Sequence, residues 1–164
     1  MKVKLMILFL LVLTMTFLSS CKEKESEKVI SKEELPALVL QSFEASYAGG
    51  EIKECAEEME DGQKFYEISF IYEDRKIDAV YTETGAVHAI EEMITQEELP
   101  QEVLDALSIE YPAFTIEKIE KIDQSGKQSY EIKGTDEGTK QRWEIKYSEQ
   151  GKVIDREKIK SATE

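Results

Sequence analysis

The side chains that most often carry enzyme chemistry are few in this chain. Its 164 residues include one histidine, His88, and two cysteines, Cys21 and Cys55. Acid–base catalysis needs a positioned reaction partner, and no Ser or Cys stands at a motif spacing from His88. Cys55 is expected to be a small apolar core residue, because a nucleophilic thiol needs a lowered pKa. We therefore expect no catalytic residue, no metal site and no cofactor, and a hydrolase is the weakest of three hypotheses.

The acidic residues are the other candidates for chemistry. The chain has 35 Asp and Glu against 21 Lys and Arg, which gives a formal net charge of −14. No D-x-D-x-D-G calcium loop occurs, so a solvated acidic face is the simpler interpretation. An envelope sensor that binds divalent cations or a small ligand on that face is the alternative function. Nucleic acid is not expected as a partner, because its phosphates would be repelled.

Cys21 lies directly after a segment typical of protein export. Residues 5–18 form an apolar run behind a basic start, too short to span a membrane but of the length of a signal-peptide core. The letters LSSC that end at Cys21 resemble the lipobox of bacterial lipoproteins, whose cysteine is lipidated and becomes the mature N-terminus. Several acyl chains together anchor a protein stably. We predict a signal peptide at 1–20 and a membrane anchor at Cys21.

The residues that follow Cys21 predict the location of the protein. The charged letters KEKESEK at 22–28 include no aromatic residue and cannot bury enough surface to fold. Residues 21–29 are therefore interpreted as a lipidated cysteine and a solvated tether. In lipoproteins of the enteric type an Asp after the cysteine favours the inner membrane, and Lys22 stands there instead. The prediction is a lipid-anchored protein of the cell envelope, at the outer membrane, on its periplasmic or its surface face.

The remainder of the chain contains an internal repeat. Residues 30–68 and 94–132, offset by 64, are identical at 13 of 39 positions without a gap, and both contain the letters EELP. Beyond them the offset becomes 66 and the agreement continues to the end of both copies. Agreement over this length indicates a duplication rather than chance. The assigned segments are repeat 1 at 30–94, repeat 2 at 95–160 and a tail at 161–164.

Each copy has the pattern of one helix followed by a four-stranded antiparallel meander. Ser31 and Thr95 each stand three residues before a glutamate, the spacing of a capping box, and a proline follows two residues later. Helices are predicted roughly over 36–47 and 100–111, where apolar residues recur on one face. The period then changes to two, with turn signals such as TETG and SEQG at hairpin spacing. The isoleucines of TIEKIEKID at 115–123 recur every third residue, which predicts a bulge.

These motifs, in this order and occurring twice, resemble the PepSY-like domain. The helices carry LPxxVxxxFxxxY and LPxxVLxxLxxxYP, and each is followed by a YEI strand, a hairpin and a final GxV strand, over residues 30 to about 160. The tandem form of this domain is described as similar to beta-lactamase inhibitor proteins. The resemblance implies an α+β fold in which both copies share one curved sheet of about eight strands. It also implies a non-catalytic module that binds or inhibits an envelope protein or peptide.

Inhibition of a beta-lactamase itself is not expected. The inhibitors that the chain resembles are disulfide-bonded, whereas Cys55 is the only cysteine beyond Cys21. Those inhibitors also present one acidic and one aromatic residue from hairpin loops. Asp74 in YEDRK is the nearest acidic counterpart, and the matching loop of repeat 2, GTDEGTKQ, contains no aromatic residue.

One difference between the copies marks a candidate contact patch. On the strand face opposite the predicted helix, Phe65 and Ile71 of repeat 1 correspond to a serine and a threonine of repeat 2. We predict a partner-binding patch with Phe65 and Ile71 at its desolvated centre. Glu67 and Asp74 would form an acidic rim that attracts a basic partner. The other interpretation is that the two apolar residues are buried under a helix or between the copies.

Overall fold

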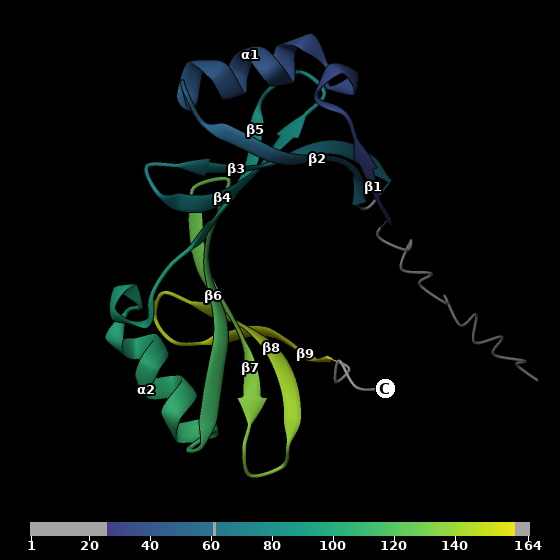
Figure 1. Cartoon of the computed structure of the whole chain (residues 1–164). Coiled ribbons are helices and arrows are strands. Elements are labelled where there is room, and N and C mark those ends of the chain that lie inside the picture. Colours follow the sequence, from purple (N-terminus) through teal and green to yellow (C-terminus); the bar gives the residue numbers. More distant parts are fainter. Residues whose placement is uncertain (1–25, 61, 160–164) are drawn as a thin grey trace, which may run out of the picture.

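The computed structural model describes residues 26–60 and 62–159, which form one sheet of nine antiparallel strands. The order of the strands in the sheet is their order in the sequence. The strands are β1 (Ser26–Ile30), β2 (Glu51–Glu60), β3 (Gln63–Tyr72), β4 (Arg75–Thr82), β5 (Val87–Met93), β6 (Phe114–Gln124), β7 (Lys127–Asp136), β8 (Gln141–Ser148) and β9 (Val153–Ile159). The helices are η1 (Lys32–Glu34), α1 (Ala37–Ser46), η2 (Gln96–Glu98) and α2 (Gln101–Glu110). The sheet is strongly curved, and both α-helices lie on its convex side (Figure 1).

The short turns before the two helices are capped as the sequence predicts. The N–H groups of Ser31 and Thr95 each donate a 2.8 Å hydrogen bond to the carboxylate of the glutamate three residues later, Glu34 and Glu98. These backbone hydrogen bonds lower the pKa of both glutamates, because they favour the charged form. A proline follows each turn and immediately precedes a helix of ten residues. The sequence therefore fixes where each helix begins.

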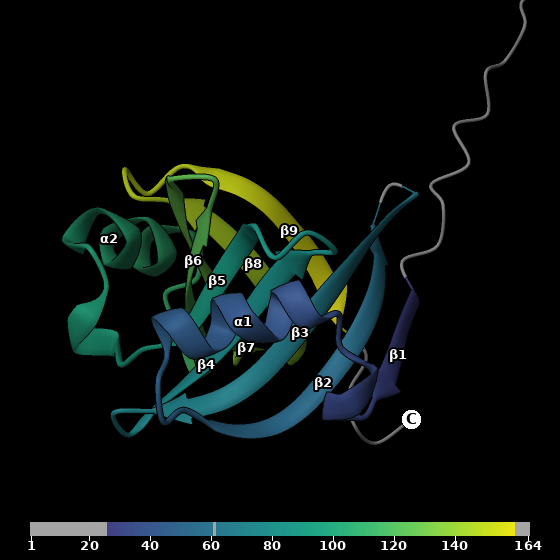
Figure 2. The same ribbon diagram turned by 90° about the horizontal axis from the view of Figure 1, so that it is seen from above.

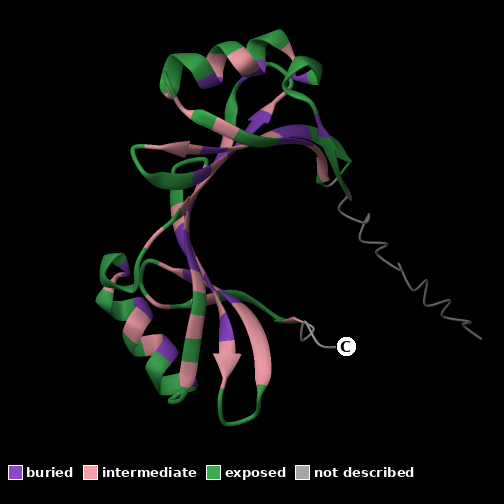
Figure 3. Cartoon of the chain, in the orientation of Figure 1, coloured by how far each residue is buried: buried purple, intermediate pink, exposed green. Residues whose placement is uncertain are grey.

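The hydrophobic core consists of two clusters, one beneath each α-helix. Val39 and Phe43 of α1 pack against β3 in the first cluster, and Val103 and Leu107 of α2 occupy the same places in the second. Figure 2 shows α1 lying across the strands of the first half, and Figure 3 shows the buried residues where helix and sheet meet. Cys55 belongs to the first cluster, and burial raises the pKa of its thiol, which confirms it as a core residue.

The number of strands and the length of the tether differ from the predictions. The α+β class and a single antiparallel sheet are confirmed, but the sheet has nine strands rather than about eight. The additional strand is β1, so residues 26–29 of the predicted tether pair with β2. The prediction considered side-chain burial alone, whereas β1 is held by its backbone hydrogen bonds. Its Val29 side chain is 61% exposed.

The predicted bulge is present and occurs in both copies. The pairing of β6 with β7 shifts between Ile116 and Lys118, and the pairing of β2 with β3 shifts at the same place, between Ile52 and Glu54. Bulges increase the local bend and twist of a sheet. The two copies are therefore curved in the same way, and β5 joins them by pairing with β4 on one side and with β6 on the other.

Candidate binding face

The side of the sheet that carries no helix is the candidate functional site. Alternation along β3 directs its even-numbered residues toward α1 and its odd-numbered residues, among them Glu67 and Ser69, to the opposite side. We call this opposite side the concave face. The strand register extends it across the sheet and places on it Glu58, Asp78, Glu91, Ile122, Glu131 and Lys146.

Phe65 lies on the concave face but is not exposed. Its side chain is only 5% exposed and packs with Val80 and Ala89 in a small cluster. The rings of Phe65 and His88 lie with their centroids 4.2 Å apart. The expectation of an exposed apolar centre is wrong at Phe65, because neighbours on its own face cover it. Neither a helix nor the contact between the copies is needed to bury it.

The other members of the predicted patch are not all brought together. Ile71 is half-buried on the concave face, opposite Lys76. Asp74 lies in the turn beyond β3, and the seven steps from Phe65 to Tyr72 at the end of that strand span roughly 23 Å at 3.3 Å per residue. Arg75 next to it pairs with Glu92 of β5 and Glu98 of η2, which ties this hairpin to the start of repeat 2. The structure thus groups Phe65 with Glu67 and leaves Asp74 apart.

Glu67 is the centre of a group of carboxylates that form no ion pair with another described residue. The Ser69 hydroxyl lies 3.2 Å from Glu67 Oε1 and 2.5 Å from Asp78 Oδ1, and a hydrogen bond joins Glu67 to Glu58. Burial, followed by the hydrogen bond with Glu58, raises the pKa of Glu67 to about 8. Burial also raises the pKa of Glu58. Among the residues that the structure describes, no Lys, Arg or His pairs with these three acids.

Glu91 extends this group onto the next strand. It lies opposite Asp78 in the pairing of β4 with β5. Burial raises the pKa of Glu91 to about 7, and the negative charges of Glu120 and Glu131 add to the effect. We call Glu58, Glu67, Asp78 and Glu91 the acidic cluster of repeat 1.

In repeat 2 a lysine stands between the acids at the equivalent position. Lys133 stands at the position of Ser69, offset by 64. Its Nζ lies 3.2 Å from Glu131, the counterpart of Glu67, and 3.0 Å from Glu144, the counterpart of Asp78. An acid–lysine–acid arrangement in repeat 2 thus corresponds to an acid–serine–acid arrangement in repeat 1.

Two further cations on the concave face of repeat 2 have no counterpart in repeat 1. Lys118, which pairs with Glu120 at 2.5 Å, stands where repeat 1 has Glu54. Lys146 stands where repeat 1 has Val80. Among the described residues, lysines on the concave face of repeat 2 therefore pair with Glu120, Glu131 and Glu144, whereas no lysine pairs with the acidic cluster of repeat 1.

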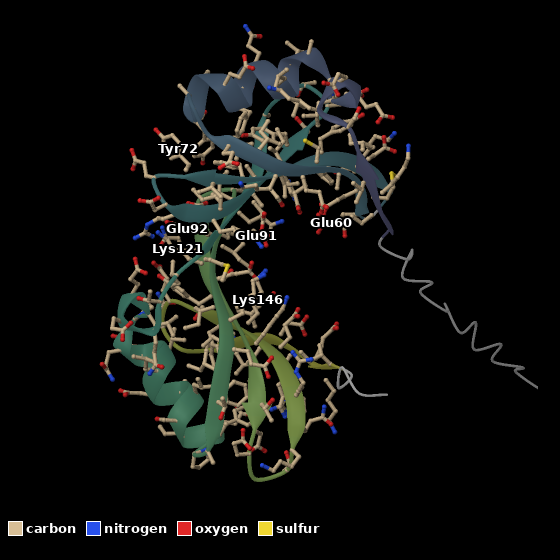
Figure 4. All side chains as sticks on the ribbon, viewed as in Figure 1. Glu60, Tyr72, Glu91, Glu92, Lys121 and Lys146 are labelled. Atoms are coloured by element: carbon tan, nitrogen blue, oxygen red, sulfur yellow. The ribbon has the colours of Figure 1, made fainter. Side chains whose placement is uncertain are left out.

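A hollow of about 480 Å³ lies on the concave face where the two halves meet. Its lining includes Glu58, Glu60, His88, Glu91, Gln124 and Lys146. Figure 4 shows Glu60, Glu91 and Lys146 on this side of the ribbon, from β2, β5 and β8. His88 Nε2 lies 3.0 Å from Gln124 Nε2 and 3.4 Å from Glu60 Oε2.

Sequence reasoning did not find His88 as part of this site. The repeat places it opposite Ile154, which gives no sign of a polar role. Its position follows from the bulge between Val80 and Tyr81 in the pairing of β4 with β5. Within residues 26–60 and 62–159, no group of three or more His, Cys, Asp or Glu side chains is arranged to hold a metal ion. Neither of the two α-helices described is long and apolar enough to cross a membrane.

The fold and the site together define a class of α+β protein: one curved antiparallel sheet, helices on its convex side, and an open polar concave face. The chain belongs to the family described as "Putative beta-lactamase-inhibitor-like, PepSY-like", whose model matches residues 12–89 and again residues 71–155. The resemblance seen in the sequence motifs is thereby confirmed.

Solved structures with a similar fold come from Bacteroides species. A Bacteroides eggerthii protein described as "putative periplasmic" has a TM-score of 0.63 and 15% identity over 76% of this chain and 88% of its own. A DUF2874 family protein of Bacteroides uniformis has a TM-score of 0.63 and 14% identity, over 75% and 88%. A BLIP-like protein of Bacteroides fragilis has a TM-score of 0.58 and 13% identity, over 77% and 89%. At these identities the likeness shows the fold. No curated protein matches the chain.

Proposed function

We propose that this protein is a non-catalytic, lipid-anchored module of the cell envelope that binds a basic surface of another envelope protein or peptide on its concave face. One observation carries the proposal. No member of the acidic cluster of repeat 1 forms an ion pair among the described residues, at the place where repeat 2 inserts Lys133 between two acids.

The energetics of buried carboxylates favour a cationic partner. Removing a carboxylate from water without a counter-charge is costly, and the raised pKa values of Glu67 and Glu91 express that cost. A Lys or Arg side chain from a partner would take the place that Lys133 takes in repeat 2. An Arg guanidinium presents several donors in a fixed fork, which suits two neighbouring carboxylates. An acidic partner would be repelled by the same residues.

The predicted patch is revised accordingly. Glu67 is the central contact, and Ile71 on the same strand supplies apolar surface at the edge of the site. Phe65 packs against the ring of His88 and is covered by its neighbours, so it does not touch a partner. Asp74 contacts the partner only where a large partner reaches past the end of β3.

The comparisons support an envelope protein that binds another protein. The family is described as beta-lactamase-inhibitor-like, and the B. eggerthii protein of similar fold is described as periplasmic. Cys21 and the signal peptide at 1–20 lie outside the described residues, so the lipid anchor rests on the lipobox and the outer-membrane location on Lys22. We also propose that each repeat, 30–94 and 95–160, is one duplicated unit of a helix and four strands. The matching bulges support this division.

The test imports the cation of repeat 2 into repeat 1 as Ser69→Lys. We expect at least a tenfold loss of binding to immobilised Lys- and Arg-rich peptides, because the acidic cluster then has its own counter-charge. The matched control is Ser69→Gln, which adds similar bulk without charge and should keep most of the binding. Binding to the unmodified protein should also weaken as salt rises. An unchanged affinity in Ser69→Lys, or an equal loss in Ser69→Gln, would contradict the proposal.

A further inference from the structure

The pairing of the edge strand β1 with β2 is equivalent to the pairing of the joining strand β5 with β6. In the pairing of β1 with β2, Glu27 lies opposite Glu58 and Val29 opposite Ala56. Adding the offset of 64 to each residue gives the pairing of β5 with β6, where Glu91 lies opposite Ile122 and Met93 opposite Glu120. β1 therefore occupies on β2 the place that β5 occupies on β6.

The pairing of the other edge strand, β9, with β8 is equivalent to the pairing of β5 with β4. Asp155 lies opposite Lys146 and Glu157 opposite Glu144. Subtracting the offset of 66 gives the pairing of β5 with β4, including its bulge. β5 is paired on both sides, whereas the outer edges of β1 and β9 pair with no other strand among the described residues. β9 corresponds to β5 but, within the described part of the chain, is paired on one side only. Its unpaired side can therefore receive a strand that corresponds to β6, and in this chain that strand is β2.

The side chains of β9 also match those of β1. Residues 26–29 are SEKV and residues 156–159 are REKI, whereas the joining strand has IEEM at the same place. Glu157 and Lys158 thus repeat Glu27 and Lys28, and Ile159 is β-branched like Val29. β9 could therefore pair with β2 through residues of the same types as those of β1.

We propose that the partner of these edges is a second copy of this chain, in which β9 of one copy replaces β1 on β2 of the next. The sheet would then run from β9 into β2 as it runs from β5 into β6 within one chain. Such an interface is head-to-tail, so each added copy leaves a free edge for another. The lipid anchor proposed at Cys21 would favour it by confining the copies to one surface.

The contacts of β1 and β9 favour the exchange. β1 has five residues against the seven of β9, so its release from β2 breaks few backbone hydrogen bonds. The donor copy loses nothing, since β9 stays on β8 and Arg156 keeps its bonds to Glu110 and Tyr111. Lys158 would face Glu57 as Lys28 does now.

Cysteine trapping tests this register. On a Cys21→Ser, Cys55→Ala background of the mature chain, Glu58→Cys and Glu157→Cys are made in separate copies, mixed and oxidised. Residues directly opposite in an antiparallel pair lie within disulfide reach. We expect at least tenfold more disulfide-linked heterodimer than from a mixture of Glu54→Cys and Glu157→Cys, whose thiols lie on the same strands out of register. Equal yields from the two mixtures would overturn the proposal.

A second variant holds β1 in place. Glu27→Cys and Glu58→Cys in one chain, on the same background, form a disulfide that fixes β1 on β2. Sedimentation should show at least a tenfold loss of self-association in this oxidised variant, and reduction should restore it. Association that is unchanged by the disulfide, or a mature chain that stays monomeric at every concentration and yields no heterodimer, would show that β9 does not bind there.

Discussion

Glu67 and Glu131 occupy the same position in the two repeats, but Glu67 has Ser69 beside it where Glu131 has Lys133. The pKa of Glu67 is about 8 in the folded chain, and its ordinary value is 4.5. Between these pH values the folded chain binds a proton that the unfolded chain has lost. Folding stability therefore falls as pH rises through this window.

We predict that Glu67→Gln removes most of this pH dependence. The amide cannot ionise, so the melting temperature should rise more at pH 8 than at pH 5. Thermal unfolding at pH 5, 6.5 and 8 checks this. Glu131→Gln is the matched control: burial raises the pKa of Glu131 as well, but this change also breaks the pairing with Lys133, so its gain at pH 8 should be smaller. The same rise at pH 5 as at pH 8 would argue against ionisation of Glu67 as the cause.

The sequence located Glu67 but not its neighbours, because those depend on strand register. Glu58 reaches Glu67 only when β2 pairs with β3 in the register that places Glu58 opposite Phe65. Phe65 shows the same limit: its absence from repeat 2 suggested an exposed contact, but His88 and Val80 from neighbouring strands cover it. Alternation assigns a residue to a face, but it does not say what lies beside that residue on the face.

At the scale of elements, the turn before the last strand of each copy is fitted against the helix. Gly85 and Gly151 have positive φ angles of 80° and 71°. A Cβ atom would lie 2.5 Å from the carbonyl oxygen of Leu38 in α1 at Gly85, and 2.2 Å from that of Glu102 in α2 at Gly151. These turns therefore hold each helix close to the sheet as well as reversing the chain.

We predict that Gly151→Ala destabilises the fold by at least about 2 kcal/mol, through backbone strain and the contact with α2 together. Gly126→Ala is the matched control, because Gly126 also has a positive φ, 77°, but nothing lies within 4 Å of the added atom. It should cost about 1 kcal/mol. Urea unfolding measures both, and equal losses would show that the contact with α2 contributes nothing.

The elements were more predictable than their contacts. Capping boxes, prolines and the change of period are local signals, so they placed both helices and the hairpins from the sequence. The TETG and SEQG turns were recognisable as turns, but their approach to Leu38 and Glu102 depends on how each helix crosses the sheet. β1 was missed because Glu27, Lys28 and Val29 show no buried face, and its pairing partner lies beyond α1 in the sequence.

At the scale of the whole molecule, the proposed membrane attachment depends on Cys21. We predict that Cys21→Ala moves the protein from the membrane fraction to the soluble fraction, because the acyl chains are its proposed anchor and residues 5–18 are shorter than a membrane span. Fractionation followed by a carbonate wash measures this. Cys55→Ala is the control and should stay with the membrane. Retention of Cys21→Ala after the wash would contradict the anchor.

The early start of β1 limits how far the molecule can rise from the membrane. Only five residues lead from Cys21 to Ser26, and a fully extended chain covers at most about 3.6 Å per residue. An anchor at Cys21 would thus keep one edge of the sheet within roughly 18 Å of the lipid, so a partner must itself approach the bilayer. Displacement of β1 by a second copy would extend the free segment from Cys21 to Ile30, or roughly 32 Å. Self-association would then set the height at which the acidic face is presented.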